Sequence, residues 1–182
     1  MTVVETGIEG LIILEPRVYE DSRGYFFESF NLKLWKSLGI IQEFVQDNQS
    51  KSSYGVIRGL HYQMAPYSQT KVVRVLTGEV LDVAIDLRKG SDTFGKSFSA
   101  LLSAENKRQM LIPKGFAHGF AVLSEEAVFY YKCDELYNPT SERGINYKDN
   151  ELSIDWKIPE DKRIISDKDK DLPSFSQADM NF

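Results

Sequence analysis

The two histidines of the chain are the residues whose type and setting first suggest chemistry. His61 lies in "RGLHYQ" and His118 in "IPKGFAHGF", each beside glycine and aromatic residues, where a backbone bends tightly near a cavity. A histidine in such a cavity suits a general base, because the unperturbed imidazole titrates close to neutral pH. A hydrogen-bonded structural histidine is a common alternative, and the pattern alone leaves both interpretations open.

A histidine base needs an orienting partner and an opposing acid. The candidate acids are the tyrosines of "FYYKCDELY", namely Tyr130, Tyr131 and Tyr137. Adjacent residues of a strand point to opposite faces, so only one of Tyr130 and Tyr131 faces inward. The other interpretation is that all three are core or rim aromatics, and pattern alone favours it.

Three cations, Arg23, Arg58 and Lys71, each lie next to an expected strand or turn. Such cations can face a phosphate-bearing ligand through charge-assisted hydrogen bonds, although solvated surface charge is the default. The aspartates of "SDKDKD" alternate with lysines near the C-terminus, a pattern typical of an exposed tail.

The "IPKGFAHGF" segment is similar to the second histidine motif of the cupins, double-sheet jelly rolls that often hold a metal. A first-row metal site would use two or three histidines and a carboxylate, but this chain has no HxH pair. Its one cysteine, Cys133, permits neither an intramolecular disulfide nor a cysteine-based zinc cluster. We therefore expect no metal and no other cofactor.

Length and charge limit the remaining classes. The 182 residues fit a single domain over 1–182, and 22 Lys and Arg against 27 Asp and Glu argue against a general binder of nucleic acid or anionic membranes. Short apolar runs such as "LIIL" form neither a signal peptide nor a membrane span. These features predict a cytoplasmic protein.

The elements that must position these residues are mostly strands. Segments such as "GVIRGLHYQ" and "EAVFYYKC" alternate or form β-branched runs between turn residues, which predicts an all-β sandwich or barrel. "LTGEV" predicts a hairpin turn at 77–79, and "LRKGSDTFGK" a longer turn. "NLKLWKSLG" predicts a short peripheral helix between a cap at Asn31 and a stop at Gly39, and the segment after 165 is expected to be irregular.

In combination and in order, these motifs resemble the dTDP-4-dehydrorhamnose 3,5-epimerase family. The resemblance is carried by "EDSRGYFFESF", "FVQDNQSKSSYGVIRGLHYQ", "KVVRVLTGEVLDVAIDLRKGSDTFGK", "LIPKGFAHGFAVLSEEAVFYYKCDELYNPTSERGI" and "ISDKDKDLP", and it ends at Pro173. It implies a dimeric, metal-free cupin-type jelly roll that inverts carbons 3 and 5 of a dTDP-linked 4-keto-6-deoxy sugar on the way to dTDP-L-rhamnose.

The resemblance also implies catalytic roles. His61 corresponds to the base, Tyr131 to the proton donor on the opposite face of the sugar, and Lys71 to the cation beside the carbonyl at carbon 4. Asp169 corresponds to the partner that orients His61, because it follows Ser166 at the family's spacing. Asp167 is the alternative partner if the alignment slips by two residues.

Further residues are implied to surround the diphosphate, the base and the sugar, some of them from a neighbouring subunit. Arg23 and Arg58 suit the diphosphate, and Tyr137 is expected to stack near the nucleotide or the sugar. The complete binding set is Arg23, Glu28, Gln46, Asp47, Asn48, Arg58, Lys71, His118, Tyr137, Glu142 and Lys168.

One segment departs from the family pattern, since Asn146 and Tyr147 stand where many members carry Arg and Trp. Three other functions remain open at this point. The chain is alternatively a single-centre 3- or 5-epimerase of another dTDP-deoxysugar pathway, a non-catalytic sugar-nucleotide-binding jelly roll, or a metal-dependent cupin enzyme.

Overall fold

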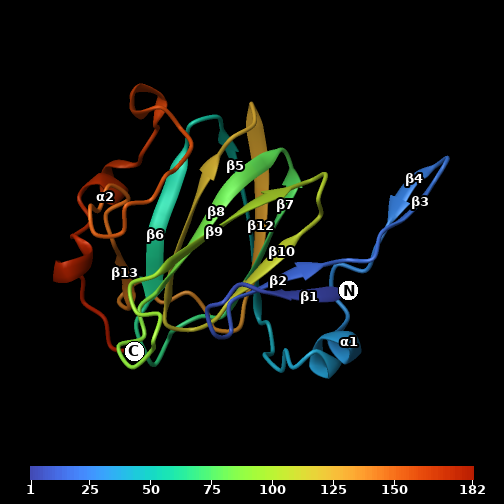
Figure 1. The fold of residues 1–182 in the computed structure, drawn as a ribbon, viewed down its shortest axis with the longest axis horizontal. Coiled ribbons are helices and arrows are strands. Elements are labelled where there is room, and N and C mark those ends of the chain that lie inside the picture. Colours follow the sequence, from blue (N-terminus) through green and yellow to red (C-terminus); the bar gives the residue numbers. More distant parts are fainter.

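The computed structural model describes residues 1–182 and consists mainly of two antiparallel sheets that pack face to face (Figure 1). The larger sheet has six strands in the order β1 (Thr2–Glu5), β2 (Ile12–Glu15), β10 (Gln109–Ile112), β7 (Lys71–Thr77), β12 (Glu126–Cys133), β5 (Gln46–Ser53). The smaller sheet has five strands in the order β13 (Glu142–Gly144), β6 (Ile57–Gln63), β11 (Phe116–Val122), β8 (Glu79–Asp86), β9 (Ser97–Ser103). The predicted all-β jelly roll is confirmed.

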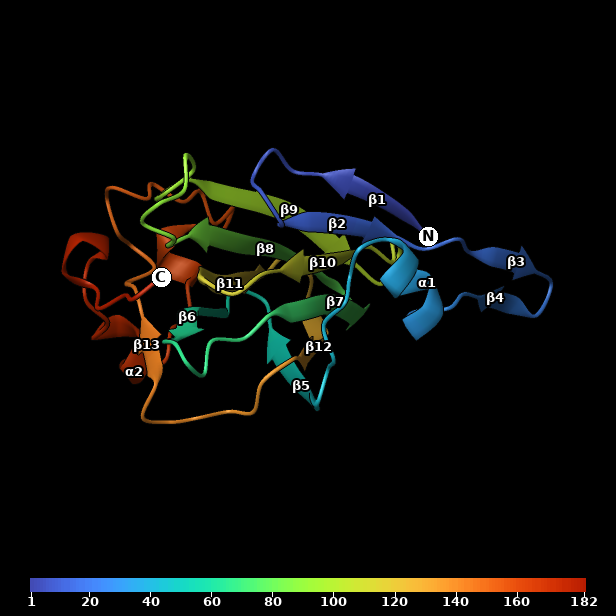
Figure 2. The ribbon, with the colours of Figure 1, turned by 90° about the horizontal axis from the view of Figure 1, so that it is seen from below.

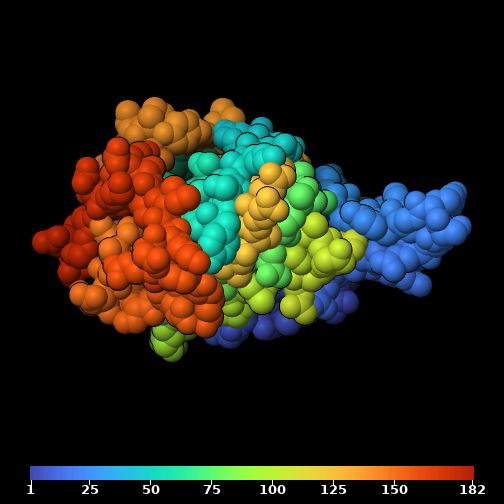
Figure 3. Space-filling view, turned by 90° about the horizontal axis from the view of Figure 1, so that it is seen from above, coloured from blue at the N-terminus to red at the C-terminus, as the bar shows by residue number.

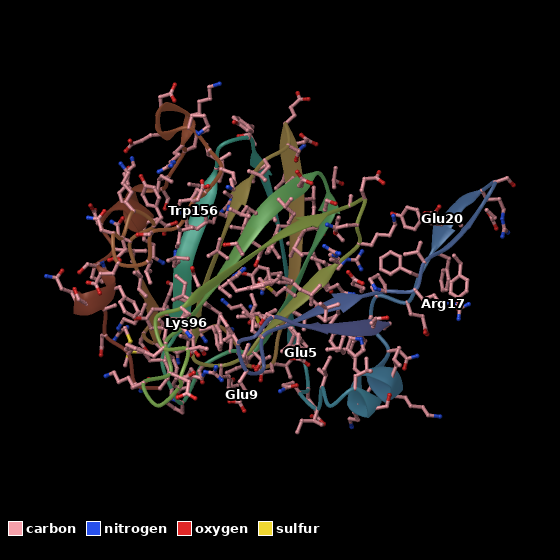
Figure 4. The ribbon with its side chains drawn as sticks, viewed as in Figure 1. Glu5, Glu9, Arg17, Glu20, Lys96 and Trp156 are labelled. Atoms are coloured by element: carbon pink, nitrogen blue, oxygen red, sulfur yellow. The ribbon has the colours of Figure 1, made fainter.

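A small hairpin of β3 (Tyr19–Asp21) and β4 (Gly24–Phe26) forms a third sheet of its own. It projects away from the two main sheets and lies far from the C-terminal segment, as Figures 1 and 2 both show. In the space-filling view it is a separate protrusion at one end of the molecule (Figure 3). Figure 4 places Arg17 and Glu20 at this end and Trp156 at the other.

The four short helices are α1 (Leu32–Ser37), η1 (Glu160–Lys162), α2 (Asp167–Lys170) and η2 (Phe175–Gln177). The predicted helix after residue 30 is confirmed: the Asn31 side chain caps it by accepting a hydrogen bond from Leu34 N, and Gly39 with φ +84° follows its end. The segment after 165 was expected to be irregular, and there the prediction was wrong in part, because it contains α2 and η2.

The apolar cluster between the sheets draws side chains from both of them. Phe129 of β12 stacks on Phe120 of β11 with 4.1 Å between ring centroids, and Val73 of β7 is fully buried beside them. Because side chains alternate along a strand, Tyr131 points to the same inner side as Phe129. The packed core therefore fixes the direction of this candidate acid.

A second apolar cluster lies on the outer face of the five-stranded sheet, where the C-terminal segment covers it. Val83 and Ile85 of β8 pack with Trp156 and Ile158, all of them buried. The Trp156 ring N–H donates to the carbonyl of Tyr147 at 2.8 Å, so the one polar atom of the indole is satisfied. This packing holds the segment that carries α2 against β6.

The predicted hairpin turn at 77–79 is wrong, because β7 and β8 belong to different sheets. Gly78, with φ +78°, is the corner at which the chain passes from one sheet to the other, and a Cβ there would meet Glu126 O at 2.1 Å. A tight glycine turn between two apolar runs looks the same in sequence whether the strands pair or separate. The predicted turn over 87–96 is confirmed.

Candidate active site

His61 and Asp169 form the first hydrogen-bonded pair of the site. His61 lies on β6, and its Nε2 is 2.7 Å from Oδ1 of Asp169. The second carboxylate oxygen accepts the backbone N–H of Gly59 at 3.3 Å, so both oxygens of the buried carboxylate are engaged. Asp167 is exposed and instead accepts from Lys170 Nζ at 2.9 Å, so it is Asp169 that the fold brings to the histidine.

Local structure explains why Asp169 points inward from a stretch rich in charge. Ser166 caps α2, its hydroxyl accepting from Asp169 N at 3.2 Å, which turns the chain so that Asp169 faces β6. Asn146 holds the segment that follows, because its Nδ2 donates to Lys170 O and Leu172 O. The residue that departs from the family pattern therefore helps to fix the segment that carries Asp169.

The charge state of Asp169 follows from its contacts. Burial by itself would raise the pKa of this carboxyl, but the hydrogen bond and the charge of His61, together with the Gly59 and Ser166 contacts, outweigh it and lower the pKa. Asp169 is therefore an anion at neutral pH. An anion at this distance fixes the tautomer and the orientation of the His61 ring.

His118 forms a second pair with Asp82, which the sequence analysis missed. His118 lies opposite His61 in the register of β11 and β6, and its Nε2 is 3.0 and 3.1 Å from the two oxygens of Asp82 on β8. Both side chains are buried. A signal was present in "DVAIDL", whose alternation gives β8 one polar face, but nothing in the pattern shows that this face points inward.

Two glycines allow the strands that carry the histidines to approach each other closely. Gly59 has φ +118°, and a Cβ on it would lie 2.6 Å from Gly119 Cα and 2.7 Å from His118 O. The pairing of β6 with β11 shifts register between His118 and Phe120. Glycine at both positions is therefore needed for the local geometry that sets the two imidazoles side by side.

Tyr131 and Lys71 reach the same pocket from the six-stranded sheet. Burial raises the pKa of Tyr131, and the nearby Arg58 opposes that shift, so the phenol stays protonated at neutral pH. Lys71 Nζ is 5.9 Å from the centre of the Tyr131 ring. Tyr130 points to the other face of the sheet, where its hydroxyl donates to Asp47 at 2.7 Å, as strand alternation predicted.

Two cations of the pocket have no carboxylate partner. Burial lowers the pKa of Lys71, whereas the more distant Cys133, Glu142 and Asp82 act in the opposite direction. Arg58 donates from Nε to the Ser52 hydroxyl at 3.0 Å, and neither cation forms a salt bridge. Both groups are therefore free to meet an anionic ligand or negative charge that develops during a reaction.

These groups share one pocket of about 670 Å³, a size that suits a small-molecule ligand. It lies between the two sheets, with Ile164 and Ile165 of the C-terminal segment along one side. Eight of the predicted site residues line it: Asn48, Arg58, His61, Lys71, His118, Tyr131, Lys168 and Asp169.

Three further predicted residues form a hydrogen-bonded rim beside the pocket. Glu142 Oε2 accepts from Tyr137 Oη at 2.9 Å and from Lys168 Nζ at 2.5 Å, and Gln46 Oε1 accepts from Tyr137 N at 2.9 Å. Asp47 lies outside the rim, on the outer face of the sheet, where it pairs with Lys132 at 2.8 Å.

Arg23 and Glu28 do not line this pocket. Arg23 lies at the turn of the projecting hairpin and pairs with Asp21 at 2.5 Å, and Glu28 follows the hairpin and accepts from Asn31 Nδ2 at 3.0 Å. Within one chain, the fold therefore keeps the two residues apart from the histidines.

No group of three or more His, Cys, Asp or Glu side chains is arranged to hold a metal ion. No helix is long and apolar enough to cross a membrane.

Comparison with known proteins shows a consistent similarity. The family model for dTDP-4-dehydrorhamnose 3,5-epimerase matches residues 5–177. The enzyme of that name from Shigella flexneri is 53% identical over 180 residues, covering 98% of each chain. The crystal structure of the enzyme of that name from Elizabethkingia anophelis is 55% identical with a TM-score of 0.93, covering 97% of each chain.

A third similar protein was solved with a ligand. It is the dTDP-6-deoxy-D-glucose-3,5-epimerase of Legionella pneumophila in complex with dTDP-4-keto-L-rhamnose. It is 51% identical with a TM-score of 0.93, and the match covers 98% of this chain and 94% of that one.

Proposed function

Because this chain belongs to the dTDP-4-dehydrorhamnose 3,5-epimerase family, we propose that it is an isomerase acting on dTDP-4-dehydro-6-deoxy-D-glucose. It inverts carbons 3 and 5 to give dTDP-4-dehydro-L-rhamnose, a step of dTDP-L-rhamnose biosynthesis. The observation that carries the proposal is that His61 and Tyr131 reach one pocket from opposite sheets. Inversion requires such an arrangement, since proton removal and return on one face would restore the starting configuration.

The chemistry starts at the carbonyl of carbon 4, which acidifies the C–H bonds of both neighbouring carbons. His61 takes the proton from carbon 3, and the electron pair of that bond moves into an enolate whose oxygen is at carbon 4. Lys71 supplies a fixed positive charge for this oxygen, and Tyr131 returns a proton to the opposite face of the carbon. His61 then loses its proton to solvent, Tyr131 regains one, and the same cycle operates at carbon 5.

Asp169 acts through His61 and does not itself react. As an anion 2.7 Å from His61 Nε2, it holds the ring with the other nitrogen free to accept a proton, and it stabilises the imidazolium that forms. This gives the carboxylate a positioning role.

The remaining predicted residues bind the substrate. Arg58 suits the diphosphate, because its guanidinium lines the pocket without a salt-bridge partner. The proposed binding set also contains Arg23, Glu28, Gln46, Asp47, Asn48, His118, Tyr137, Glu142 and Lys168.

The protein acts as a homodimer in this proposal, and the projecting hairpin supplies Arg23 and Glu28 to the pocket of the second copy. Exposed aromatic side chains on the hairpin, Tyr19, Tyr25 and Phe26, favour contact with another surface. The separation of Arg23 from the histidines within one chain supports the same arrangement. Mixing an Arg23→Ala variant with a His61→Asn variant tests it, because only exchange of subunits then produces intact sites.

We also propose that residues 1–182 form a single domain and that the protein is located in the cytoplasm. Size-exclusion chromatography with light scattering measures the mass of the assembly. Fractionation of cells that carry a tagged chain tests the location.

The test of the reaction is proton NMR of the protein with dTDP-4-dehydro-6-deoxyglucose in heavy water. Deuterium at carbons 3 and 5 with inversion at both is the expected result. Exchange and inversion at one carbon would show a single-centre epimerase, and saturable binding without exchange would show a binding protein.

A further inference from the structure

In the loop between β12 and β13, side chains of three glutamines hold the backbone of residues 135–137 to the rest of the protein. No backbone-to-backbone hydrogen bond involves residues 135–137. Gln69 Nε2 donates to Glu135 O at 2.8 Å, Gln46 Oε1 accepts from Tyr137 N at 2.9 Å, and Gln63 makes the contacts described next. A loop tied in this way depends on a few side chains for its conformation, because it has no strand or helix of its own.

Gln63 has the central place among the three. It is buried at the end of β6, two residues after His61. Its Nε2 donates to Tyr67 O at 2.6 Å and to Leu136 O at 3.2 Å, and its Oε1 accepts from Asn138 N at 2.7 Å. Two of these three bonds reach the residues directly before and after Tyr137.

Tyr137 is thereby held at the rim of the pocket with its ring available. Its hydroxyl bonds to Glu142, which also accepts from Lys168, a residue of the pocket wall. The side chain of Tyr137 is nevertheless exposed. An aromatic ring that is fixed at its backbone and its hydroxyl but open on its face is preorganised to cover a ligand at low entropic cost.

We propose that Gln63 is a positioning residue that sets Tyr137 for binding of the nucleotide sugar, an inference that rests on the proposed function of the pocket. Gln63 touches no reacting atom, so its loss affects binding and leaves the chemical step intact. If Tyr137 stays in place in only about one in ten molecules of a variant that lacks Gln63, the apparent affinity for the nucleotide sugar falls roughly tenfold.

The test compares Gln63→Met with Gln69→Met. Both variants replace a glutamine by an apolar side chain of similar length, but only the first removes bonds on both sides of Tyr137. Gln63→Met is expected to raise KM about tenfold with kcat within about twofold, and Gln69→Met is expected to change either constant by less than about twofold. Titration of dTDP by calorimetry measures binding without turnover, so a loss of dTDP affinity in Gln63→Met stands even if the reaction assigned above is wrong.

A double-variant cycle with Tyr137→Ala separates positioning from a general structural effect. If Gln63 acts through Tyr137, adding Gln63→Met to Tyr137→Ala leaves KM and the dTDP affinity unchanged. An unchanged KM in folded Gln63→Met, or the same fold-loss in both backgrounds, would overturn the proposal. Should Gln63→Met fail to fold, Gln63→Asn is used, whose amide is one methylene too short to keep all three bonds and is expected to raise KM in the same way.

Discussion

Two pairs of histidine and aspartate, each with its histidine in the wall of the pocket, differ in how they are built. His61 is 30% exposed at its side chain and meets Asp169, which comes from a segment 108 residues further along the chain. His118 is 9% exposed and meets Asp82, which comes from the neighbouring strand of the same sheet and is fully buried. One pair is open to the pocket, and the other lies largely within the sheet.

The two aspartates also differ in the direction of their pKa shifts. The contacts of Asp169 outweigh its burial and lower the pKa, whereas burial raises the pKa of Asp82 despite its contact with His118. An ionised partner supports an open imidazole that gains a proton during reaction, and a deeply buried pair is suited to holding a ring in place. The difference shows that contact with a carboxylate does not by itself make a histidine a catalytic base. The access of the imidazole to the pocket and the charge of its aspartate partner decide whether it can act as one.

Replacing each histidine by asparagine gives the largest expected contrast. His61→Asn should lower kcat by about 10²–10⁴-fold, the usual contribution of a general base, and should abolish exchange of the protons at carbons 3 and 5. His118→Asn should mainly raise KM and leave exchange at both carbons. Steady-state kinetics with NMR detection checks both, and loss of exchange in His118→Asn alone would reverse the roles given to the two pairs.

Tyr131→Phe tests whether the proton donor is Tyr131 or the pair of His118 and Asp82. If Tyr131 returns the proton, the variant should lose about 10²–10³-fold in formation of inverted product. Exchange on the His61 face should continue, since the base is intact. Tyr130→Phe is the matched control, because that hydroxyl lies on the other face of the sheet. Inversion at the normal rate in Tyr131→Phe would assign the donor to another group, with His118 the first candidate.

Asp169→Asn tests whether Asp169, and not the nearby Asp167, is the partner of His61. The amide keeps the shape but not the charge, so kcat is expected to fall about 10–100-fold with little change in KM. Asp167→Asn is the control, since Asp167 is exposed and contacts Lys170. An equal loss in both variants would point to the helix as a whole, and a loss in Asp167→Asn alone would favour the alternative partner.

The open pair shows how far sequence reasoning reaches. His61 lies in a motif whose apolar alternation and glycine are typical of a strand that follows a turn. The strand that carries His61 was therefore predictable from the sequence. Asp169 was placed only through family resemblance, because its run of alternating charge is typical of solvent-exposed chain. Its inward direction depends on the Ser166 cap and on the packing of the segment that contains Trp156, which are long-range properties.

The buried pair shows where such reasoning fails. Asp82 and Ala84 share a face of β8, and alternation identifies that face, but it does not say which side of the sheet is covered. Both faces of β8 are buried here, one by the opposite sheet and one by the C-terminal segment. The same limit explains the wrong hairpin at Gly78, since local turn chemistry does not reveal which strands pair across long distances.

The smallest expected effect, and the most direct comparison of the two aspartates, is on stability. Asp169 has a pKa lowered from 3.8, so its contribution is present above that pH and is lost as the pH falls through its folded pKa. Asp82 has a pKa raised from 3.8, so its contribution is present below that pH and is lost as the pH rises through its folded pKa. Urea unfolding between about pH 2.5 and 6.5 measures the free energy of unfolding of each variant relative to the unmodified chain. The stability lost in Asp169→Asn should grow with rising pH, and the stability lost in Asp82→Asn should shrink. Each change is expected to be on the order of 1 kcal/mol. Parallel slopes would mean that the two carboxylates share one electrostatic environment, and the division into an open pair with an ionised aspartate and a buried pair would not hold.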